Sequence, residues 1–391
     1  MSFIYLDNNA TTQLDSAVLE AMLPYLKDLY GNPSSMQHRL GREAHKAVET
    51  ARQRVAQAIG AKEQEIYFNS GATEGINTVL RGVAQSYATK GKHIITCKTE
   101  HKAVLTTCEL LERQGMEITY LDVNNNGELS LDQLKNAIRP DTILVCLMSA
   151  NNETGVLHPI SDIAHICQER DVLYFCDVTQ SIGKHPLHVQ QLPVDLLVFS
   201  AHKLHGPKGT GVLYIRRRTA KPIQIPPLIS GGKQENNLRG GTLNVPNIVG
   251  CGQALANIET KPQIKALRDM LEKQIISRVP ETFVNGQIEK RLDNTSNITF
   301  RHLKSTEIMT ALPDIALSSG SACVSGLSDP SHVLKAMGLS NEDAHSSIRF
   351  SLSKYTTEQD VADVVQQIEQ VVTRLREASP IWKLFKDGLI P

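Results

Sequence analysis

The stretch Leu196-Leu-Val-Phe-Ser-Ala-His-Lys-Leu-His-Gly-Pro-Lys-Gly-Thr-Gly211 decides the fold of this 391-residue chain. An apolar strand runs here into a polar, glycine-rich turn, and another strand, Gly211 to Arg217, follows soon after. A parallel crossover needs about a dozen or more residues, so we expect this next strand to run antiparallel. The turn also carries Lys203 out of a buried strand. Burial lowers the pKa of a lysine and makes its amine available as a Schiff-base partner or base, although a solvated strand-end lysine is the alternative.

Short β-rich runs and helical runs alternate through the region before this stretch. The expected strands are Ile66 to Phe68, His93 to Cys97, Glu117 to Val123, Thr142 to Ala150, Leu173 to Val178 and Leu196 to His202, with helices near 74–89, 103–114, 130–138 and 161–170. This alternation predicts an α/β fold with a mostly parallel sheet between helices. Active sites of such sheets form at the carboxyl ends of the strands, where the following segments converge.

A second, smaller α+β unit is expected to begin near residue 260. It opens with a helix at about 262–279 and continues through strands Ser296 to Phe300 and Ser347 to Leu352. Thr357 is expected to cap the last helix of this unit, with Asp360 three positions on. Apolar residues form a stripe along the rest of this helix. We therefore predict a large domain over 15–259 and a small domain made of 1–14 and 260–391.

Composition limits the classes of function. Lys and Arg together number 41, as do Asp and Glu, and this zero net charge gives no reason to expect direct binding of nucleic acid or membrane. The N-terminus resembles no secretion signal and no apolar run reaches about eighteen residues, so we expect a cytoplasmic protein. Seven cysteines without a C-x-x-C pair argue against a disulfide framework and a structural metal site. Six are expected to be packing residues: Cys97, Cys108, Cys146, Cys167, Cys176 and Cys251.

If Lys203 holds pyridoxal phosphate, the cofactor needs a carboxylate for its pyridine nitrogen and a cradle for its phosphate. Asp177 ends an apolar strand and would supply the carboxylate, although a helix cap is the alternative. The turn 69–75 leads into a helix, so backbone amides such as that of Ala72 and the Thr73 hydroxyl are available to a phosphate. Ser200 and His202, just before the lysine, could add hydrogen bonds.

Two further strand ends carry candidate polar residues. His101 could stack on the cofactor ring or move protons, with a purely structural role as the alternative. Asn152, in Asn151-Asn-Glu-Thr-Gly155, could face the cofactor or a substrate carboxylate, and simple turn chemistry is its alternative.

Ten motifs, in order along residues 4 to about 380, resemble the cysteine desulfurases of the NifS/IscS type. They are Leu6-Asp-Asn-Asn-Ala-Thr-Thr12, Gly31-Asn-Pro-Ser-Ser35, Ser70-Gly-Ala-Thr-Glu74, Thr99-Glu-His101, Asn151-Asn-Glu-Thr-Gly155, Asp177-Val-Thr-Gln180, Ser200-Ala-His-Lys203, Arg239-Gly-Gly-Thr242, Ser318-Ser-Gly-Ser-Ala-Cys323 and His345-Ser-Ser-Ile-Arg-Phe350. The resemblance implies a fold-type I pyridoxal phosphate enzyme of the class V aminotransferase group, with a seven-stranded sheet in its large domain. It also implies a homodimer that converts L-cysteine to L-alanine.

The resemblance assigns a role to each site residue. Lys203 would carry the cofactor and shuttle the substrate α-proton, while Asp177 would pair with the pyridine nitrogen. The other cofactor contacts would come from Gln180 on the phenolic oxygen, His101 on the ring, and Ala72, Thr73, Ser200, His202 and the partner subunit's Thr242 on the phosphate. Arg349 with Asn152 would clamp the substrate carboxylate, a task suited to a guanidinium.

Cys323 would accept the sulfur as a persulfide. Its surroundings, about 318–330, are rich in glycine and serine and would form a mobile arm that visits the cofactor and then a sulfur-acceptor protein. The sequence leaves the acceptor open among an iron–sulfur scaffold, with iron–sulfur bound only transiently, and the enzymes of tRNA thiolation or DNA sulfur modification. A selenocysteine or cystine lyase of the same fold and a degenerate binding protein are the alternatives.

Two features depart from the family pattern. Arg239-Gly-Gly-Thr242 replaces the usual Arg-Ser-Gly-Thr, which removes one hydroxyl but keeps the threonine expected at the phosphate. The chain stops at Pro391, whereas housekeeping members carry a longer tail that engages the iron–sulfur scaffold. The sequence therefore leaves open whether a scaffold docks in the same way.

Overall fold

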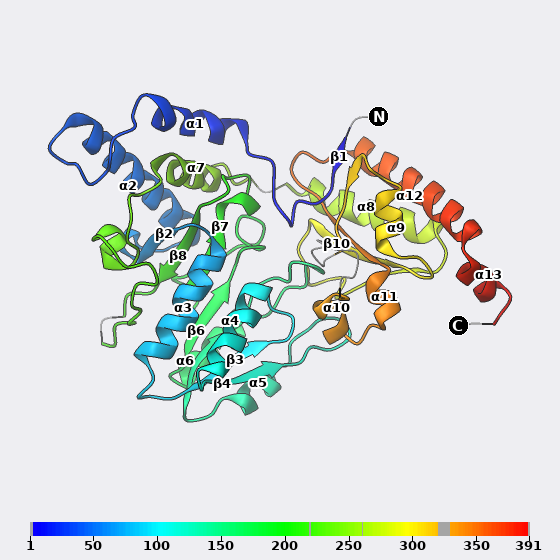
Figure 1. The fold of residues 1–391 in the computed structure, drawn as a ribbon, viewed down its shortest axis with the longest axis horizontal. Coiled ribbons are helices and arrows are strands. Elements are labelled where there is room, and N and C mark those ends of the chain that lie inside the picture. The colour runs from blue at the N-terminus through cyan, green and yellow to red at the C-terminus, as the bar shows by residue number, and fades with distance from the viewer. Residues whose placement is uncertain (1–2, 219, 260, 320–328, 390–391) are drawn as a thin grey trace.

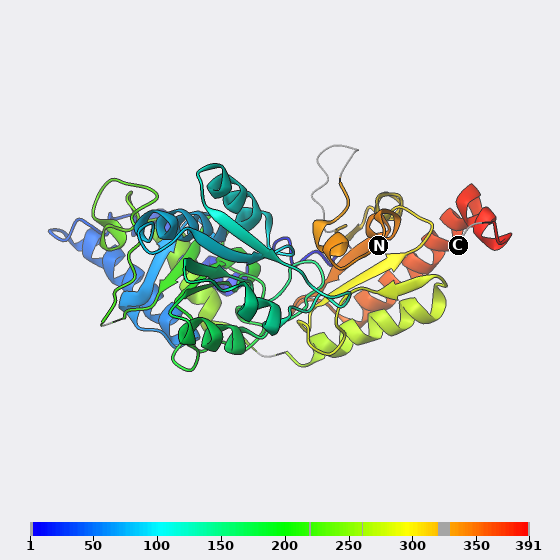
Figure 2. The same cartoon turned by 90° about the horizontal axis from the view of Figure 1, so that it is seen from below.

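The computed structural model describes residues 3–218, 220–259, 261–319 and 329–389, and Cys323 lies outside them. Two groups of elements lie side by side, a larger one around a seven-stranded sheet and a smaller one around a three-stranded sheet (Figure 1). Seen from below, the C-terminal helices lie at the end of the molecule away from the large sheet (Figure 2).

The seven-stranded sheet has the order β2-β8-β7-β6-β5-β3-β4. Its strands are β2 (Ile66–Asn69), β3 (His93–Cys97), β4 (Glu117–Leu121), β5 (Thr142–Cys146), β6 (Leu173–Asp177), β7 (Leu196–Ser200) and β8 (Gly211–Ile215). Strand β8 pairs antiparallel with both β2 and β7, and the other pairs are parallel. The predicted α/β fold and the predicted direction of the strand after Lys203 are confirmed.

Helices cover both faces of this sheet. Helices α3 (Ala72–Ser86) and α4 (Lys102–Arg113) pack against one face, where Ile94 lies. Helices α2 (Arg39–Ile59), α6 (Ile160–Glu169) and α7 (Val245–Ala256) pack against the other, where Ile95 lies. Helices α1 (Ser16–Lys27) and α5 (Leu131–Ala137) flank that second layer. Both faces are therefore apolar, as expected for parallel strands.

The smaller group is built on the sheet β12-β10-β9, with β9 (Thr282–Val284), β10 (Thr295–Phe300) and β12 (Ser347–Ser351). Helices α8 (Gln263–Arg278) and α12 (Glu358–Ala378) pack on it. Thr357 and Asp360 form the predicted capping box of α12. The remaining elements are α9 (Ser305–Thr310), α10 (His332–Ala336), α11 (Asn341–His345), α13 (Pro380–Lys386) and the pair β1 (Ile4–Tyr5) with β11 (Ile315–Ala316).

Some expectations were incomplete. The helix α13 follows α12, so the helix starting after Thr357 is not the last, and the structure also contains α1, α2 and α7, which the sequence patterns did not predict. Strand β1 pairs with β11, which brings the N-terminal segment to the smaller group. The domain boundaries at 14/15 and 259/260 stay a prediction.

The cysteine interpretation is confirmed for the six packing residues, all of which are buried free thiols. Within the described ranges, no helix combines the length and apolar character needed to cross a membrane. The described side chains also contain no cluster of three or more histidine, cysteine or acidic residues that could hold a metal ion.

Candidate active site

The carboxyl ends of the central strands converge on a cavity of about 600 Å³. Its lining includes the predicted residues Ala72, Thr73, His101, Asn152, Asp177, Gln180, Ser200, His202, Lys203 and Arg349. The remaining two predicted residues are placed differently. Thr242 is exposed and does not line this cavity, and Cys323 lies outside the described residues.

Lys203 enters the cavity from a short 3-10 turn, Ala201–Lys203, directly after β7. Its Nζ donates to the backbone carbonyl oxygens of Asn9 at 2.5 Å and of Ala10 at 2.6 Å. Burial, followed by the nearby positive charge of Arg349, lowers the pKa of Lys203 to about 8. A larger fraction of this amine is therefore neutral, and hence nucleophilic, near pH 7 than in an ordinary lysine.

We expect this pKa to be measurable in the cofactor-free protein. Only the neutral amine reacts with an acylating reagent, so labelling of Lys203 should rise with pH around a midpoint near 8. Solvated lysines as a group should have a midpoint near 10.4. Pulsed acetylation followed by peptide mass spectrometry measures both in one sample. A Lys203 midpoint at the value of the solvated lysines would contradict the prediction.

Asp177 and Gln180 belong to the segment that leaves β6. Asp177 ends the strand, is 7% exposed, and accepts a hydrogen bond from the Thr179 backbone N–H at 2.8 Å. Gln180 donates through Nε2 to the carbonyl oxygen of Asn9 at 3.0 Å. The same carbonyl therefore contacts Lys203 and Gln180, which brings the amine and the amide together.

His101 and His202 are both held by local hydrogen bonds. His101 caps α4, where its Nδ1 accepts from the Ala103 N–H at 3.1 Å. His202 Nδ1 lies 3.1 Å from the Thr11 hydroxyl oxygen. Desolvation by the surrounding protein lowers the pKa of His101, and desolvation with the Lys203 charge lowers that of His202 to about 4. Neutral rings can stack or hydrogen-bond without adding positive charge.

The N-terminus of α3 provides an anion cradle next to Ser200. Gly71 precedes the helix with φ 151° and, as a glycine, has no side chain to cap the first turn. The Ala72 N–H donates to Ser200 Oγ at 2.8 Å, which leaves the Ser200 hydroxyl proton available as a donor. A neighbouring cavity of about 420 Å³ is lined by Gly71, Thr73, His202 and Lys208. Helix amides, hydroxyls and a lysine together suit a phosphate.

Arg349 comes from β12 of the smaller group and is 4% exposed. Its Nη2 forms an ion pair with Asp7 at 2.7 Å, and its Nη1 donates to the Asn152 carbonyl oxygen at 2.9 Å. The guanidinium therefore lies at the edge of the cavity shared by both groups of elements.

The N-terminal residues at the site were not predicted from the sequence to have a role there. Asp7, Asn9 and Ala10 line the cavity and hold Arg349 and Lys203. The signal that could have found them is the motif Leu6-Asp-Asn-Asn-Ala-Thr-Thr12, a polar run directly after the short strand β1.

The fold and site together define a pyridoxal phosphate enzyme of fold type I: a lysine amine and a carboxylate lie at strand ends beside the N-terminus of a helix. Residues 4–364 match the family model described as Aminotransferase class-V, and the chain belongs to this family, within its cysteine desulfurase group. It is 47% identical to the cysteine desulfurase IscS of Pasteurella multocida strain Pm70, over 99% of this chain and 96% of that protein.

Two solved structures are similar to this chain over most of its length. A NifS-like protein superposes with a TM-score of 0.87 at 37% identity, over 95% of this chain and all of that chain. SspA in complex with cysteine superposes with a TM-score of 0.80, also at 37% identity, over 90% of this chain and all of that one.

Pyridoxal phosphate is the cofactor of this group, and the residues present fit it. The N-terminus of α3 with Ser200 suits its phosphate, Asp177 its pyridine nitrogen and the Lys203 amine its aldehyde. Gly71 also supports the fit, because a Cβ added there would lie 3.3 Å from Ser200 Oγ and crowd the cradle. When bound, the cofactor stabilises negative charge at the α-carbon of an amino acid.

Proposed function

We propose that this protein is a cysteine desulfurase that removes sulfur from L-cysteine, with L-alanine and a persulfide on Cys323 as the products. The C–S bond of the substrate and the S–H bond of Cys323 break, while an S–S bond forms on Cys323 and a C–H bond forms at the substrate β-carbon. The β-carbon gains the two electrons that the two sulfur atoms lose, so the exchange needs no external oxidant. The observation that carries the proposal is the meeting of Lys203, Asp177 and Arg349 in one cavity, in a chain related over its full length to IscS.

Lys203 would serve first as the point of attachment for the cofactor and then as the base that moves the substrate α-proton. Its lowered pKa supports both tasks, because an amine with a pKa of about 8 can lose and regain a proton near neutral pH. The carbonyl oxygens of Asn9 and Ala10 would hold the free amine in place between these steps.

The other lining residues would hold the cofactor. Asp177 would keep a proton on the pyridine nitrogen, Gln180 would donate to the phenolic oxygen, and His101 would cover the ring. The phosphate would be bound by Ala72, Thr73, Ser200 and His202, joined by Thr242 from the partner subunit. The exposed position of Thr242 supports this last role, because the residue is available to a second copy of the chain.

Arg349 would bind the substrate carboxylate, with the Asn152 side chain beside it. Asp7 accepts from the guanidinium in this structure and would share it with the substrate. We expect Arg349→Lys to raise KM for L-cysteine by about tenfold to a hundredfold, because lysine cannot reproduce the forked hydrogen bonds. Steady-state kinetics of alanine formation measure this. An unchanged KM would place the carboxylate elsewhere.

The proposal also covers the sulfur acceptor, the oligomeric state and the cellular location. We infer a homodimer, because Thr242 would complete the site of the other subunit, and a cytoplasmic enzyme that passes sulfur to an acceptor protein. An iron–sulfur scaffold or a thiolation enzyme suits this role, and equal numbers of basic and acidic residues favour delivery through protein over direct handling of nucleic acid. L-cysteine as substrate is supported by the cysteine complex of the related SspA.

A single-turnover experiment tests the proposal. The cofactor-loaded protein receives one equivalent of L-cysteine without reductant, and alanine and the mass of the Cys323 peptide are measured. We expect about one alanine per active site and a persulfide on that peptide, followed by sulfide release when a thiol is added. Alanine without a persulfide would overturn the mechanism. Faster turnover of selenocysteine or cystine without a persulfide would identify a lyase instead.

A further inference from the structure

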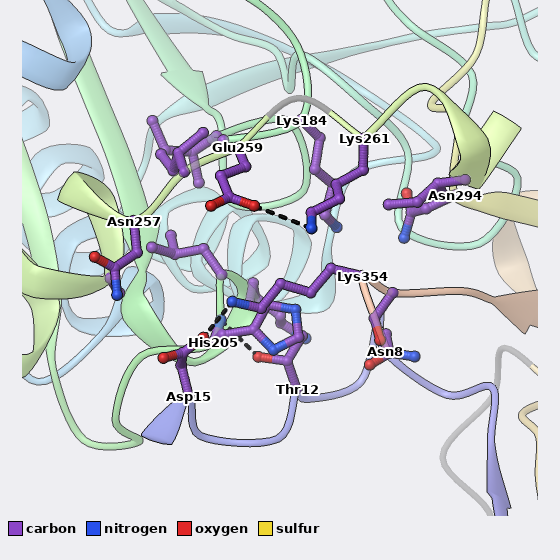
Figure 3. A pocket seen from close by; sticks show the side chains of 18 of the residues that line it. Asn8, Thr12, Asp15, Lys184, His205, Asn257, Glu259, Lys261, Asn294 and Lys354 are labelled. Atoms are coloured by element: carbon purple, nitrogen blue, oxygen red, sulfur yellow. Dashed lines mark hydrogen bonds and ion pairs between the residues drawn. The ribbon is translucent and has the colours of Figure 1, made fainter. Parts of the chain in front are cut away.

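A lysine behind the active site contacts a residue that the proposed function uses. Lys184 lines a second pocket, of about 100 Å³, together with Asp15, Glu259, Lys261 and Lys354 (Figure 3). It is not among the described residues that line the active-site cavity, whereas Gln180 is. Gln180 therefore lies between the active-site cavity and the side chain of Lys184.

Local structure brings the two residues together. The chain after β6 forms successive turns in which the Ile182 N–H donates to the Val178 carbonyl oxygen at 2.8 Å and the His185 N–H to that of Ser181 at 2.8 Å. Residues four apart lie above one another in such turns. The Nζ of Lys184 lies 3.4 Å from Oε1 of Gln180, a long hydrogen bond strengthened by the charge of the ammonium group.

Two contacts agree on the orientation of the Gln180 amide. In its protonated form Lys184 has only donors, so it then requires the amide oxygen on its side. The Asn9 carbonyl oxygen can only accept, so it requires the amide NH₂ group, which lies 3.0 Å away. One N–H of this NH₂ group serves Asn9, and the other can be offered to an acceptor in the cavity.

Among the residues that the structure describes, no carboxylate pairs with Lys184 to explain its position. Asp15 is bonded to Lys354, and Glu259 forms an ion pair with Lys261 at 3.0 Å. Within the described part of the chain, no carboxylate lies at ion-pair distance from Lys184. Burial, followed by the charges of Lys203 and Arg349, lowers the pKa of Lys184 to about 7. A half-buried cation without a carboxylate is costly, which favours a role in the site.

We propose that Lys184 is a positioning residue for the desulfurase reaction, which holds the oxygen of the Gln180 amide and so directs an N–H into the active-site cavity. The inference rests on the proposed function, in which that N–H meets the phenolic oxygen of the cofactor. That oxygen needs a donor, and a flipped amide would present an acceptor instead.

The test compares variants of the cofactor-loaded, full-length protein by the pH midpoint of the visible cofactor absorption band and by kcat. We expect Lys184→Met to raise the midpoint by about half a unit, because an anionic oxygen that loses a donor is protonated more easily. The same variant should lower kcat about fivefold, the size expected from one hydrogen bond. Lys184→Arg, which keeps the donors, should stay close to the unmodified protein.

Two controls separate positioning from general charge or folding effects. Lys261→Met removes a cation from the same pocket without a contact to Gln180, and should move neither readout. In a Gln180→Ala background, Lys184→Met should have no further effect, because coupled residues are not additive. An unchanged midpoint in Lys184→Met, an equal shift in Lys261→Met, or additive effects would each overturn the inference. An unmodified protein without a cofactor band would overturn the proposed function as well.

Discussion

Replacing Lys203 with alanine is expected to abolish the formation of alanine from L-cysteine, with a fall in kcat of at least about a thousandfold. This amine would both attach the cofactor and move the α-proton, and the described cavity offers no second lysine side chain to take over. Two measurements check the prediction: alanine production at saturating L-cysteine, and the absorption spectrum of the protein after addition of pyridoxal phosphate.

Lys203→Arg is the matched control. Arginine keeps the positive charge and can still donate to the carbonyl oxygens of Asn9 and Ala10, but it stays protonated. We therefore expect it to be as inactive as the alanine variant. A small primary amine added to Lys203→Ala should restore part of the activity. An active Lys203→Arg variant would show that the charge of Lys203, and not its amine chemistry, is what the reaction requires.

Cys323→Ala should bind the cofactor normally and yet lose turnover, with alanine formation at least about a hundredfold slower in the presence of excess thiol. Without the Cys323 thiol, no nucleophile is available to attack the substrate sulfur. The comparison must be made at equal cofactor content, so that a defect in binding is not mistaken for a defect in sulfur transfer. Alanine and sulfide are measured together.

Cys167→Ala is the matched control, because it removes a cysteine thiol that has no role in the proposed reaction. Cys167 is buried in α6, and burial raises the pKa of its thiol, so it is neither accessible nor ionised. This variant should keep full turnover. Undiminished turnover of Cys323→Ala would refute the persulfide mechanism and favour a lyase that acts on selenocysteine or cystine.

Much of the fold could be predicted because its signals are local. Strand β3 was predicted with both ends correct, and the capping box of α12 was predicted from Thr357 and Asp360. The direction of β8 followed from the length of a single loop. Helices α1 and α2 were missed because the alternation of strands and helices becomes clear only from residue 66, and α7 was missed because it lies after the last strand of that alternation. Helix α13 was missed because it follows α12 after a single residue.

The candidate site could also be predicted only in part. Lys203, Asp177 and Ser200 were found from the sequence because Asp177 and Ser200 end recognisable strands and Lys203 comes shortly after one. The acceptors of the Lys203 amine were not found, since they are backbone carbonyl oxygens of Asn9 and Ala10, and every residue has a carbonyl oxygen. No residue type marks such a partner.

The sequence by itself determined the class of fold, the strand ends that carry the chemistry and the family, because periodicity, capping and ordered motifs are properties of neighbouring residues. Only the tertiary structure decided which groups meet. Asp7 pairs with Arg349 across 342 positions, and Lys203 reaches Asn9 across 194. Such contacts depend on how β1 and β12 pack beside the large sheet, and the free energy of that packing is spread over many buried side chains.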